Sequence, residues 1–395
     1  MANSITKIFN FTKPLPLSLY IHIPWCIRKC PYCDFNSHQM QGKIPENDYI
    51  NALLADLEQD LPKIQERAIS SIFIGGGTPS ILSPEAIYQL LTGVQRRLPI
   101  RKNTEITLEA NPGSIKDNTR FQAFREAGIN RLSLGIQSFN ETALQGLERI
   151  HGRIEAINAI DKAMKAGFNQ INFDLMFGLP AQTIEAALKD LQIAVSFQPS
   201  HLSWYQLTIE PNTPFYHNTP PLPDNDILWE MQNAGQNYLA KQGYFQYEIS
   251  AYAKSGQQCQ HNLNYWKFGD YLGIGAGAHG KISETHLGTI TRTSKQRHPQ
   301  NYLQSSPAII ANHSKLTPPE VGLEFMMNAL RLYEGFTNQT FIENTGLNLA
   351  YLEKPIEQAY LQRWLVKNEK NGIPHIRATD TGMRFLNEVL DLFVP

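Results

Sequence analysis

Short apolar segments alternate with segments of helical periodicity through about two thirds of this 395-residue chain. Six such apolar segments begin near residues 17, 70, 105, 131, 170 and 201. This alternation predicts parallel strands with helices packed outside them, and therefore an α/β fold. Because crossovers between parallel strands are almost always right-handed, successive units wind the same way around. Periodicity alone fits both a barrel and an open, doubly wound sheet.

The unusual residues of these units lie where a strand ends and its loop begins. Clustered cysteines follow the first strand, GGGTP at 75–79 follows the second, and Glu109, Gln137 and Asp174 follow the next ones. In a barrel the carboxyl ends of all strands share one rim, where several loops build the site. An open sheet gathers its ligand near one switch point instead. The distribution therefore favours a barrel.

The pattern changes after residue 285. We expect a core over residues 1–285, a polar, irregular linker over 286–316 and a small helical, winged-helix-like domain over 317–395. Thr317 and Glu320 form a predicted capping box at the start of an apolar helix in this last part. The domain is expected to pack against the core or cover it as a lid.

Charge and hydropathy exclude two classes of partner. Residues 351–395 carry six Lys or Arg and six Asp or Glu, and the whole chain has a net charge of -1, so the basic surface of a nucleic-acid-binding protein is missing. No apolar run approaches the roughly 18 to 20 residues of a membrane span. The first residues lack the features of a signal peptide. We expect a cytoplasmic protein.

Three of the four cysteines, Cys26, Cys30 and Cys33, lie within eight positions at C-x3-C-x2-C spacing, and Cys259 stands alone. In a reducing cytosol such a group indicates metal binding or redox chemistry rather than a disulfide framework. The spacing leaves two metal sites open. Zinc would need a fourth ligand such as a nearby histidine, His22 or His38. An iron–sulfur cluster with three protein ligands would leave one iron free for another ligand.

The cysteine motif CIRKCPYC after the first strand and GGGTP after the second together resemble the radical S-adenosylmethionine (SAM) superfamily. The resemblance implies that Cys26, Cys30 and Cys33 hold a [4Fe–4S] cluster and that the amino and carboxylate groups of SAM chelate its fourth iron. It implies that Cys259 is not a ligand. The implied fold is a partial (β/α)6 barrel, consistent with the six units.

Further motifs extend the resemblance over nearly the whole chain. LYIHIPWC, CPYCDFNS, LEANP, GIQSF, DLMFGLP and FMMNALRL resemble the coproporphyrinogen-oxidase-like branch of the superfamily. The residues that the resemblance places in contact with SAM are Tyr20, Tyr32, Gly76, Gly77, Thr78, Glu109, Gln137, Arg149 and Asp174.

Three of these side chains also need an explanation on physical grounds. An unpaired carboxylate in the apolar strand of Asp174 would cost several kcal/mol, so it must meet a partner or a ligand. Glu109 and Gln137 are in the same situation, and each alone could instead cap the next helix. Three such residues in successive units indicate one ligand, and a ribose and a sulfonium cation would suit these acceptors.

Three features distinguish the members of this branch. Oxygen-independent coproporphyrinogen III dehydrogenases of the HemN type carry a fourth cysteine where Phe35 stands here, and a longer extension before the first cysteine. HNLNYW, at 261–266, matches the H-N-x-x-Y-W element of HemW-type haem chaperones. The resemblance therefore implies haem delivery to acceptor proteins, respiratory ones among them, by a protein that could form a homodimer. Oxidative decarboxylation of coproporphyrinogen III is the alternative.

HNLNYW also has a physical interpretation. His261 could give an imidazole to haem iron, while Tyr265 and Trp266 would supply flat apolar surface for the macrocycle. His22 and His279 compete for the same role. In the alternative, the aromatic residues belong to the core and the histidine is satisfied by hydrogen bonds.

Overall fold

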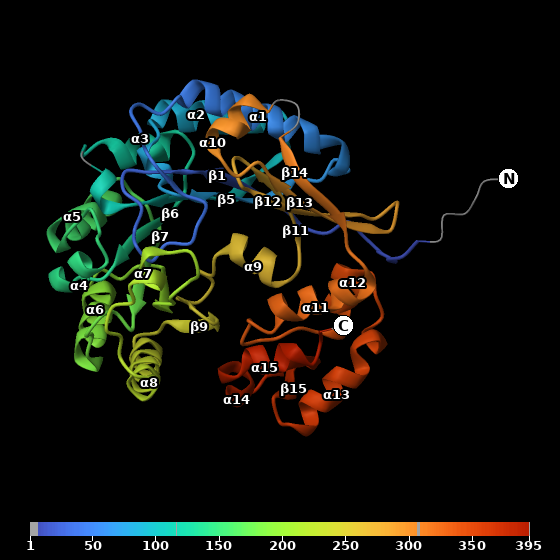
Figure 1. The fold of residues 1–395 in the computed structure, drawn as a ribbon. Coiled ribbons are helices and arrows are strands. Elements are labelled where there is room, and N and C mark those ends of the chain that lie inside the picture. Colours follow the sequence, from blue (N-terminus) through green and yellow to red (C-terminus); the bar gives the residue numbers. More distant parts are fainter. Residues whose placement is uncertain (1–6, 116, 306–308, 395) are drawn as a thin grey trace.

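The computed structural model describes residues 7–115, 117–305 and 309–394. Its centre is a curved twelve-stranded sheet with helices on its outer face (Figure 1). Six consecutive parallel strands form the middle of the sheet, in the order in which they occur in the chain. They are β1 (Leu17–Ile23), β4 (Ile69–Gly76), β5 (Ile100–Ala110), β6 (Arg131–Gln137), β7 (Gln170–Phe177) and β8 (His201–Gln206). The six expected strands are thus confirmed.

The sheet is a partial barrel, because its two edge strands are β14 and β9 and these do not pair in the described part of the chain. β1 and β7 are buried on almost every residue, as strands covered on both faces should be. Ser83 and Thr183 cap two of the outer helices by accepting a backbone N–H. The outer helices are α1 (Glu46–Asp60), α2 (Pro84–Gln95), α3 (Arg120–Glu126), α4 (Glu141–Gly146), α5 (Arg153–Lys165), α6 (Ile184–Ser196) and α8 (Asn225–Lys241).

Additional strands extend both edges of the parallel sheet. Beyond β8 lies β10 (Ala251–Ala253), which is antiparallel to β8, and then β9 (Phe245–Glu248), which is antiparallel to β10. Beyond β1 lies β11 (Asp270–Ile274), which is parallel to it, followed by the antiparallel β12 (His279–Glu284). Helix α9 (Gln260–Trp266), which contains HNLNYW, connects the two extensions.

The expected linker over 286–316 is wrong. This segment contains β13 (Thr289–Lys295) and β14 (Ile310–Lys315), which complete the sheet, and α10 (Pro299–Gln304), which packs on α1. β14 is an edge strand that is exposed along most of its length. Its side chains therefore do not alternate between apolar and polar, and main-chain hydrogen bonds to β13 define it instead.

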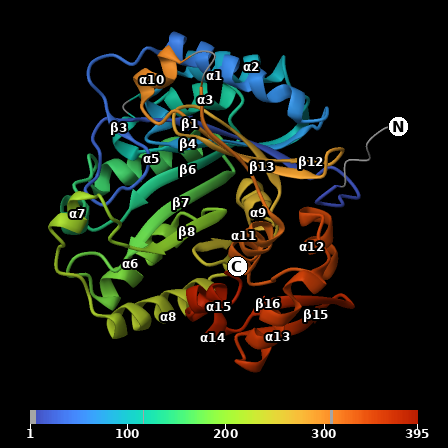
Figure 2. The same cartoon turned by 45° about the vertical axis from the view of Figure 1, so that its right-hand side comes forward.

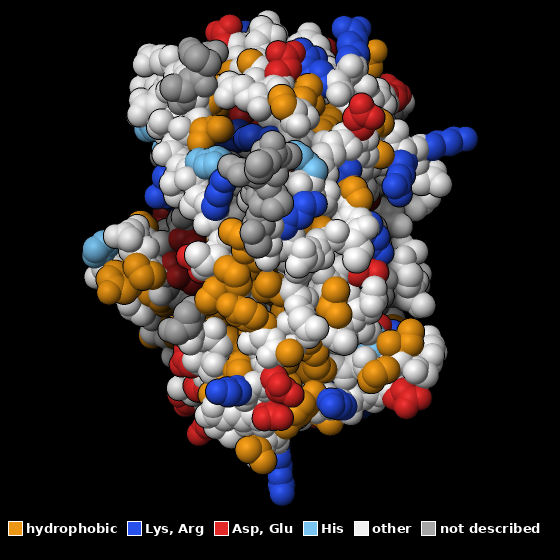
Figure 3. Space-filling view, turned by 90° about the vertical axis from the view of Figure 1, so that its right-hand side faces the viewer, with side chains coloured by type: hydrophobic (Ala, Val, Ile, Leu, Met, Phe, Trp, Pro, Cys, Tyr) orange, Lys and Arg blue, Asp and Glu red, His pale blue; other side chains and the backbone are white. Residues whose placement is uncertain are grey.

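The C-terminal part has a hydrophobic core separate from that of the sheet. Phe325 packs edge-on against Phe336 and Phe341 at its centre. The predicted capping box at Thr317 and Glu320 is present. Figure 2 shows the helices beside a two-stranded hairpin, and acidic and basic side chains are interspersed on the face in Figure 3. The elements are α11 (Pro318–Ala329), α12 (Asn338–Thr345), α13 (Glu353–Leu361), β15 (Leu365–Lys370), β16 (Ile373–Ala378), α14 (Asp380–Arg384) and α15 (Leu386–Asp391).

No helix within the described ranges has both the length and the apolar character required to cross a bilayer. α8, with 17 residues, carries charged and amide side chains among its apolar ones.

A buried charge network joins β11, β12 and the segment before β4. The Asp270 carboxylate is fully buried and lies 2.8 Å from Lys281 Nζ and 2.7 Å from Arg67 Nη1. Burial alone would raise the pKa of Asp270, but the two cations outweigh it and the pKa is lowered. Ser283 donates to the same carboxylate from its backbone and its hydroxyl. The network ties β11 and β12 to the segment before β4, and so holds this extension of the sheet in place beside β1.

Replacing Asp270 by alanine should lower the free energy of unfolding by about 3–5 kcal/mol, because two buried cations lose their counter-charge. Urea unfolding followed by circular dichroism measures the change. The control is Lys370→Ala, which removes an exposed pair with Glu334 and should cost less than about 1 kcal/mol. Equal costs for the two variants would show that the buried network does not stabilise the fold.

Candidate cluster and cofactor site

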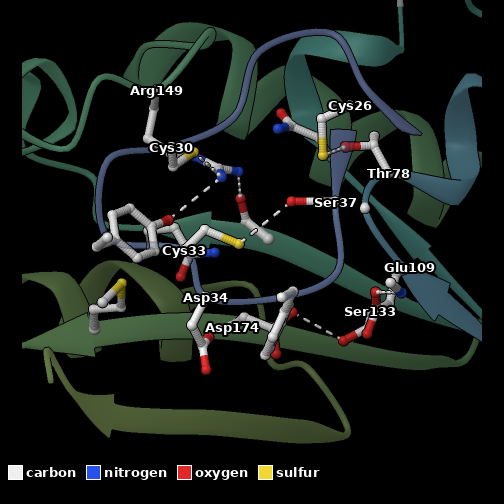
Figure 4. A pocket seen from close by; sticks show the side chains of 18 of the residues that line it. Cys26, Cys30, Cys33, Asp34, Ser37, Thr78, Glu109, Ser133, Arg149 and Asp174 are labelled. Atoms are coloured by element: carbon white, nitrogen blue, oxygen red, sulfur yellow. Dashed lines mark hydrogen bonds between the residues drawn. The ribbon is translucent and has the colours of Figure 1, made fainter. Parts of the chain in front are cut away.

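A cavity of about 790 Å³ lies at the carboxyl ends of the parallel strands (Figure 4). Its volume is in the range of about 300–1,000 Å³ that is usual for ligand pockets. The structure brings most of the predicted site residues together on its wall. Those that line it are Cys26, Cys30, Tyr32, Cys33, Gly76, Gly77, Thr78, Glu109, Gln137, Arg149 and Asp174. The expectation of a shared rim therefore holds for all of them.

The three clustered thiols belong to the loop that follows β1, and each has its own neighbour. Cys26 Sγ lies 3.5 Å from the Thr78 hydroxyl, and Cys33 Sγ lies 3.8 Å from that of Ser37. Burial raises the pKa of Cys26 and of Cys33, so these thiols are neutral in the ligand-free protein. Metal binding would have to release their protons.

The donor set fits an iron–sulfur cluster better than a single ion. Among the described residues, no group of three or more His, Cys, Asp or Glu side chains is arranged to hold one metal ion. A cluster, in contrast, takes each thiolate on a different iron, so its protein ligands are spread apart. Three free thiols along one loop at the wall of a cavity match that requirement.

Arg149 is a half-buried cation beside the cysteine loop. Its Nη1 lies 3.4 Å from Cys30 Sγ and 3.5 Å from the Tyr32 hydroxyl, while Nη2 donates to the Gly135 carbonyl at 2.7 Å. These contacts tie Cys30 and Tyr32 of the cysteine loop to the backbone of β6, so Arg149 holds the loop in position.

A small apolar cluster packs against the cysteine loop. Phe215 donates its backbone N–H to the Pro31 carbonyl at 3.0 Å, and its ring lies 6.4 Å from that of Tyr32. The cluster explains how a loop with almost no regular structure keeps its thiols in place. Its buried members are Leu147, Met176, Leu179, Leu207 and Phe215.

The glycines of GGGTP allow the end of β4 to approach the cysteine loop closely. A Cβ on Gly77 would lie 2.5 Å from the Trp25 carbonyl oxygen, and Gly76 has a φ of 115°, which favours glycine. The Gly76 N–H donates to Glu109, the Thr78 N–H donates to Trp25, and the Gly77 N–H donates to a β1 carbonyl. All three N–H groups are therefore paired within the protein, and they hold the end of β4 against β1, the cysteine loop and Glu109.

Two carboxyl groups, Glu109 and Asp174, lie half-buried near the strand ends. Burial raises the pKa of Glu109 to about 8, and the nearby Asp174 contributes to this shift. The hydrogen bond from the Gly76 N–H acts in the opposite direction but is the smallest of the three effects. Burial also raises the pKa of Asp174, whose oxygens accept hydrogen bonds from Ser133 at 3.0 Å and Asn172 at 2.7 Å. Half-buried acceptors of this kind suit a ligand that carries positive charge and hydroxyl groups.

Several residues of the cavity were not identified from the sequence. Tyr205 donates to Gln137 Oε1 at 2.8 Å, and Ser133 and Asn172 orient Asp174. Arg331 reaches the cavity from the end of α11. Ser133 and Asn172 each lie two residues along their strand from another polar side chain, and therefore on the same face of that strand. This spacing of polar residues within an apolar strand is the signal in the sequence that could have identified them. Nothing in the sequence near Tyr205 distinguishes it from a core aromatic residue.

Two predicted residues do not line the cavity. The Tyr20 hydroxyl lies 2.9 Å from His22 Nδ1, and Tyr20 is not among the lining residues. His261 is 1% exposed, and its two ring nitrogens lie 3.0 Å from the Ser71 hydroxyl and 3.1 Å from that of Tyr265. Burial lowers the pKa of His261 to about 3. This is the geometry of a hydrogen-bonded core histidine, so the structure does not support His261 as a haem ligand.

The sequence of this chain is similar to those of known proteins. The model of the radical SAM superfamily matches residues 20–193. The chain is 50% identical to "Heme chaperone HemW" of Haemophilus influenzae over 96% of this chain and 98% of that protein. The chain belongs to the HemW family of radical SAM proteins. It is 48% identical to "Heme chaperone HemW" of Escherichia coli, with coverage of 96% and 98%, and 33% identical to that of Bacillus subtilis, with coverage of 95% and 99%.

The fold of the HemW-family chain is also that of a solved enzyme structure. Coproporphyrinogen III oxidase (HemN) from Escherichia coli, described as a radical SAM enzyme, matches with a TM-score of 0.80 over 96% of this chain and 90% of the enzyme. The sequence identity is 21%, so the likeness establishes the shared architecture and not the activity. The expected partial barrel with a C-terminal helical domain is therefore confirmed.

Proposed function

We propose that this protein is a haem chaperone that binds haem in the cytoplasm and delivers it to acceptor proteins, with respiratory proteins among the recipients. The observation that carries the proposal is the 50% identity to a protein named as a haem chaperone over almost the full length of both chains. HNLNYW, which marks this family, is present and forms helix α9.

The same proposal includes a [4Fe–4S] cluster and SAM. Cys26, Cys30 and Cys33 would hold the cluster, and an iron without a protein ligand would coordinate SAM. When bound, this pair supplies one-electron chemistry at the cavity. Glu109 and Asp174 would accept hydrogen bonds from SAM or stabilise its positive charge. The closeness of the cavity wall to all three thiols supports this assignment.

The second candidate function is that of an oxygen-independent coproporphyrinogen III dehydrogenase. The fold shared with HemN favours it. Phe35 argues against it, because this side chain replaces the fourth cysteine of the HemN motif. It lies at the cavity with 60% of its surface exposed, and it has no group that could bind metal.

An anaerobic assay separates the two functions. The reconstituted protein, with its cluster intact and SAM bound, should form no protoporphyrinogen from coproporphyrinogen III and a reductant. The same preparation should bind haem and transfer it to an apo-cytochrome, followed by the absorption of the reconstituted acceptor. Formation of protoporphyrinogen, or failure to bind haem, would contradict the chaperone function.

A further inference from the structure

Arg331 is the only residue beyond residue 210 that lines the cavity, among the residues that the structure describes. It follows the last turn of α11, and the backbone around it pairs with β9. The Tyr333 N–H donates to the Tyr247 carbonyl at 3.1 Å, and Leu332 forms an antiparallel bridge with Glu248. Figure 2 shows α11 next to α9 at this junction. The position of Arg331 is therefore set by main-chain contacts between the two parts of the molecule.

The Arg331 guanidinium has donors to spare. Its carbon lies 4.4 Å from the centre of the Trp266 ring, and its Nη2 lies 3.4 Å from a Glu248 oxygen. Glu248 is the one hydrogen-bond partner of this guanidinium in the described parts of the chain, and the contact is long for an ion pair. Arg331 Nε and Trp266 Nε1 are both buried without an acceptor there. Arg331 Nη1, in contrast, has no hydrogen-bond partner among the described residues and is not enclosed, so it is the donor that a ligand in the cavity can reach.

The other cations at the cavity are already engaged. Arg28 pairs with Glu148, and Arg149 donates to Gly135 and contacts the cysteine loop. The Arg331 side chain is 30% exposed and makes no hydrogen bond or ion pair with that loop within the described ranges. An anionic group that enters the cavity away from the cysteines would therefore meet Arg331 as its counter-charge.

We propose that Arg331 binds a carboxylate of the ligand, and that this carboxylate is a propionate of haem. The inference rests on the proposed haem-chaperone function and locates one end of the haem at the junction of the sheet and the C-terminal part. A guanidinium stacked on Trp266 has its orientation restricted, and its planar fork matches a carboxylate with two parallel hydrogen bonds. SAM carries the other candidate carboxylate, which is expected at the cluster and hence at the cysteine loop.

The test compares haem with haem dimethyl ester, whose propionates carry no charge, on the full-length protein with its cluster reconstituted. Arg331→Met should weaken haem binding about 10- to 100-fold, as expected for lost hydrogen bonds to a charged group. Binding of the dimethyl ester and of SAM should not change. Arg331→Lys should recover part of the haem affinity, because it restores the charge without the fork. Absorption titration measures haem, and equilibrium dialysis measures SAM.

Glu248 provides the matched control for folding. Arg331→Met leaves the buried Glu248 carboxylate without its cation, so the double variant with Glu248→Gln removes both charges and should show the same selective loss of haem. Glu248→Gln alone frees the guanidinium and should bind haem several-fold more tightly.

Three results would overturn the inference. Equal losses for haem and its dimethyl ester would assign Arg331 a structural role. A loss of SAM affinity would assign Arg331 to the carboxylate of SAM, and unchanged haem affinity would leave it without a ligand. If the unaltered protein binds neither haem nor the ester, the proposed function fails together with the inference, whereas the first three results leave that function intact.

Discussion

Replacing Cys30 by alanine should abolish the iron–sulfur cluster of the reconstituted protein. Two thiolates would remain on a cluster that already has one iron without a protein ligand, and iron would be lost to solvent. The broad absorption near roughly 400 nm that thiolate-ligated iron gives, and the bound iron itself, should fall to background. Visible absorption and iron analysis after anaerobic reconstitution measure both. Cys26→Ala and Cys33→Ala should behave in the same way, because all three thiols line the cavity.

Cys259→Ala is the matched control for the cysteine variants. This thiol is fully buried, lies 3.5 Å from a Glu105 oxygen and does not line the cavity. Its removal should leave the iron content and the absorption spectrum unchanged. A cluster that survives Cys30→Ala, or one that is lost with Cys259→Ala, would show that the three-thiol loop is not the cluster site.

Replacing Glu109 by glutamine should weaken SAM binding by about 10- to 100-fold, because a carboxylate that would accept hydrogen bonds from SAM or stabilise its positive charge is lost. The affinity of the unaltered protein should also depend on pH. Burial and the nearby Asp174 raise the pKa of Glu109 to about 8, so the empty site holds this group neutral at pH 7. A cationic ligand favours the ionised form. SAM affinity should therefore rise by up to about 10-fold per pH unit below 8 and level off above it.

The matched control is Glu105→Gln, near the middle of the same strand and outside the cavity lining. Glu105 accepts backbone N–H groups at the start of α9, so its loss should not change the pH dependence of SAM binding. Glu109→Gln should flatten that dependence. A slope that persists in Glu109→Gln would show that another group titrates.

The raised pKa of Glu109 also has a consequence for stability. Its carboxyl is protonated in the folded, ligand-free protein at pH values where the unfolded chain, with an ordinary pKa of 4.5, has lost the proton. The stability that this group contributes is thus fully present below about 4.5 and is lost as pH rises toward about 8. SAM should offset that loss by binding the folded form.

The expectations that the structure confirmed depend on local patterns. Each of the six central strands coincides with an apolar segment of the sequence, and the order of these strands in the sheet is their order in the chain. The capped start of α11 was predictable from Thr317 and Glu320 because a capping box involves only neighbouring residues. The three cysteines line one cavity, as their place directly after the first strand predicted.

The expectations that failed concern residues whose role depends on distant neighbours. His261 is conspicuous in HNLNYW, but Ser71 from β4 and Tyr265 occupy both of its ring nitrogens. The segment over 286–316 lacks the apolar pattern of a strand, because its outer strand gains hydrogen bonds from β13 without burying its side chains. Neither fact can be deduced from residues close in the chain.

The sequence by itself determined the βα alternation, the three-thiol loop and the acidic residues at the strand ends. These follow from periodicity and spacing, which are properties of neighbouring residues. Only the tertiary structure decided that the N–H groups of Gly76 and Gly77 pair with Glu109 and with β1, that His261 belongs to the core and that Arg331 reaches the cavity. The physical reason is that hydrogen-bond pairing and burial depend on which segments the fold brings side by side, even when about two hundred residues separate them along the chain, as they do Ser71 and His261.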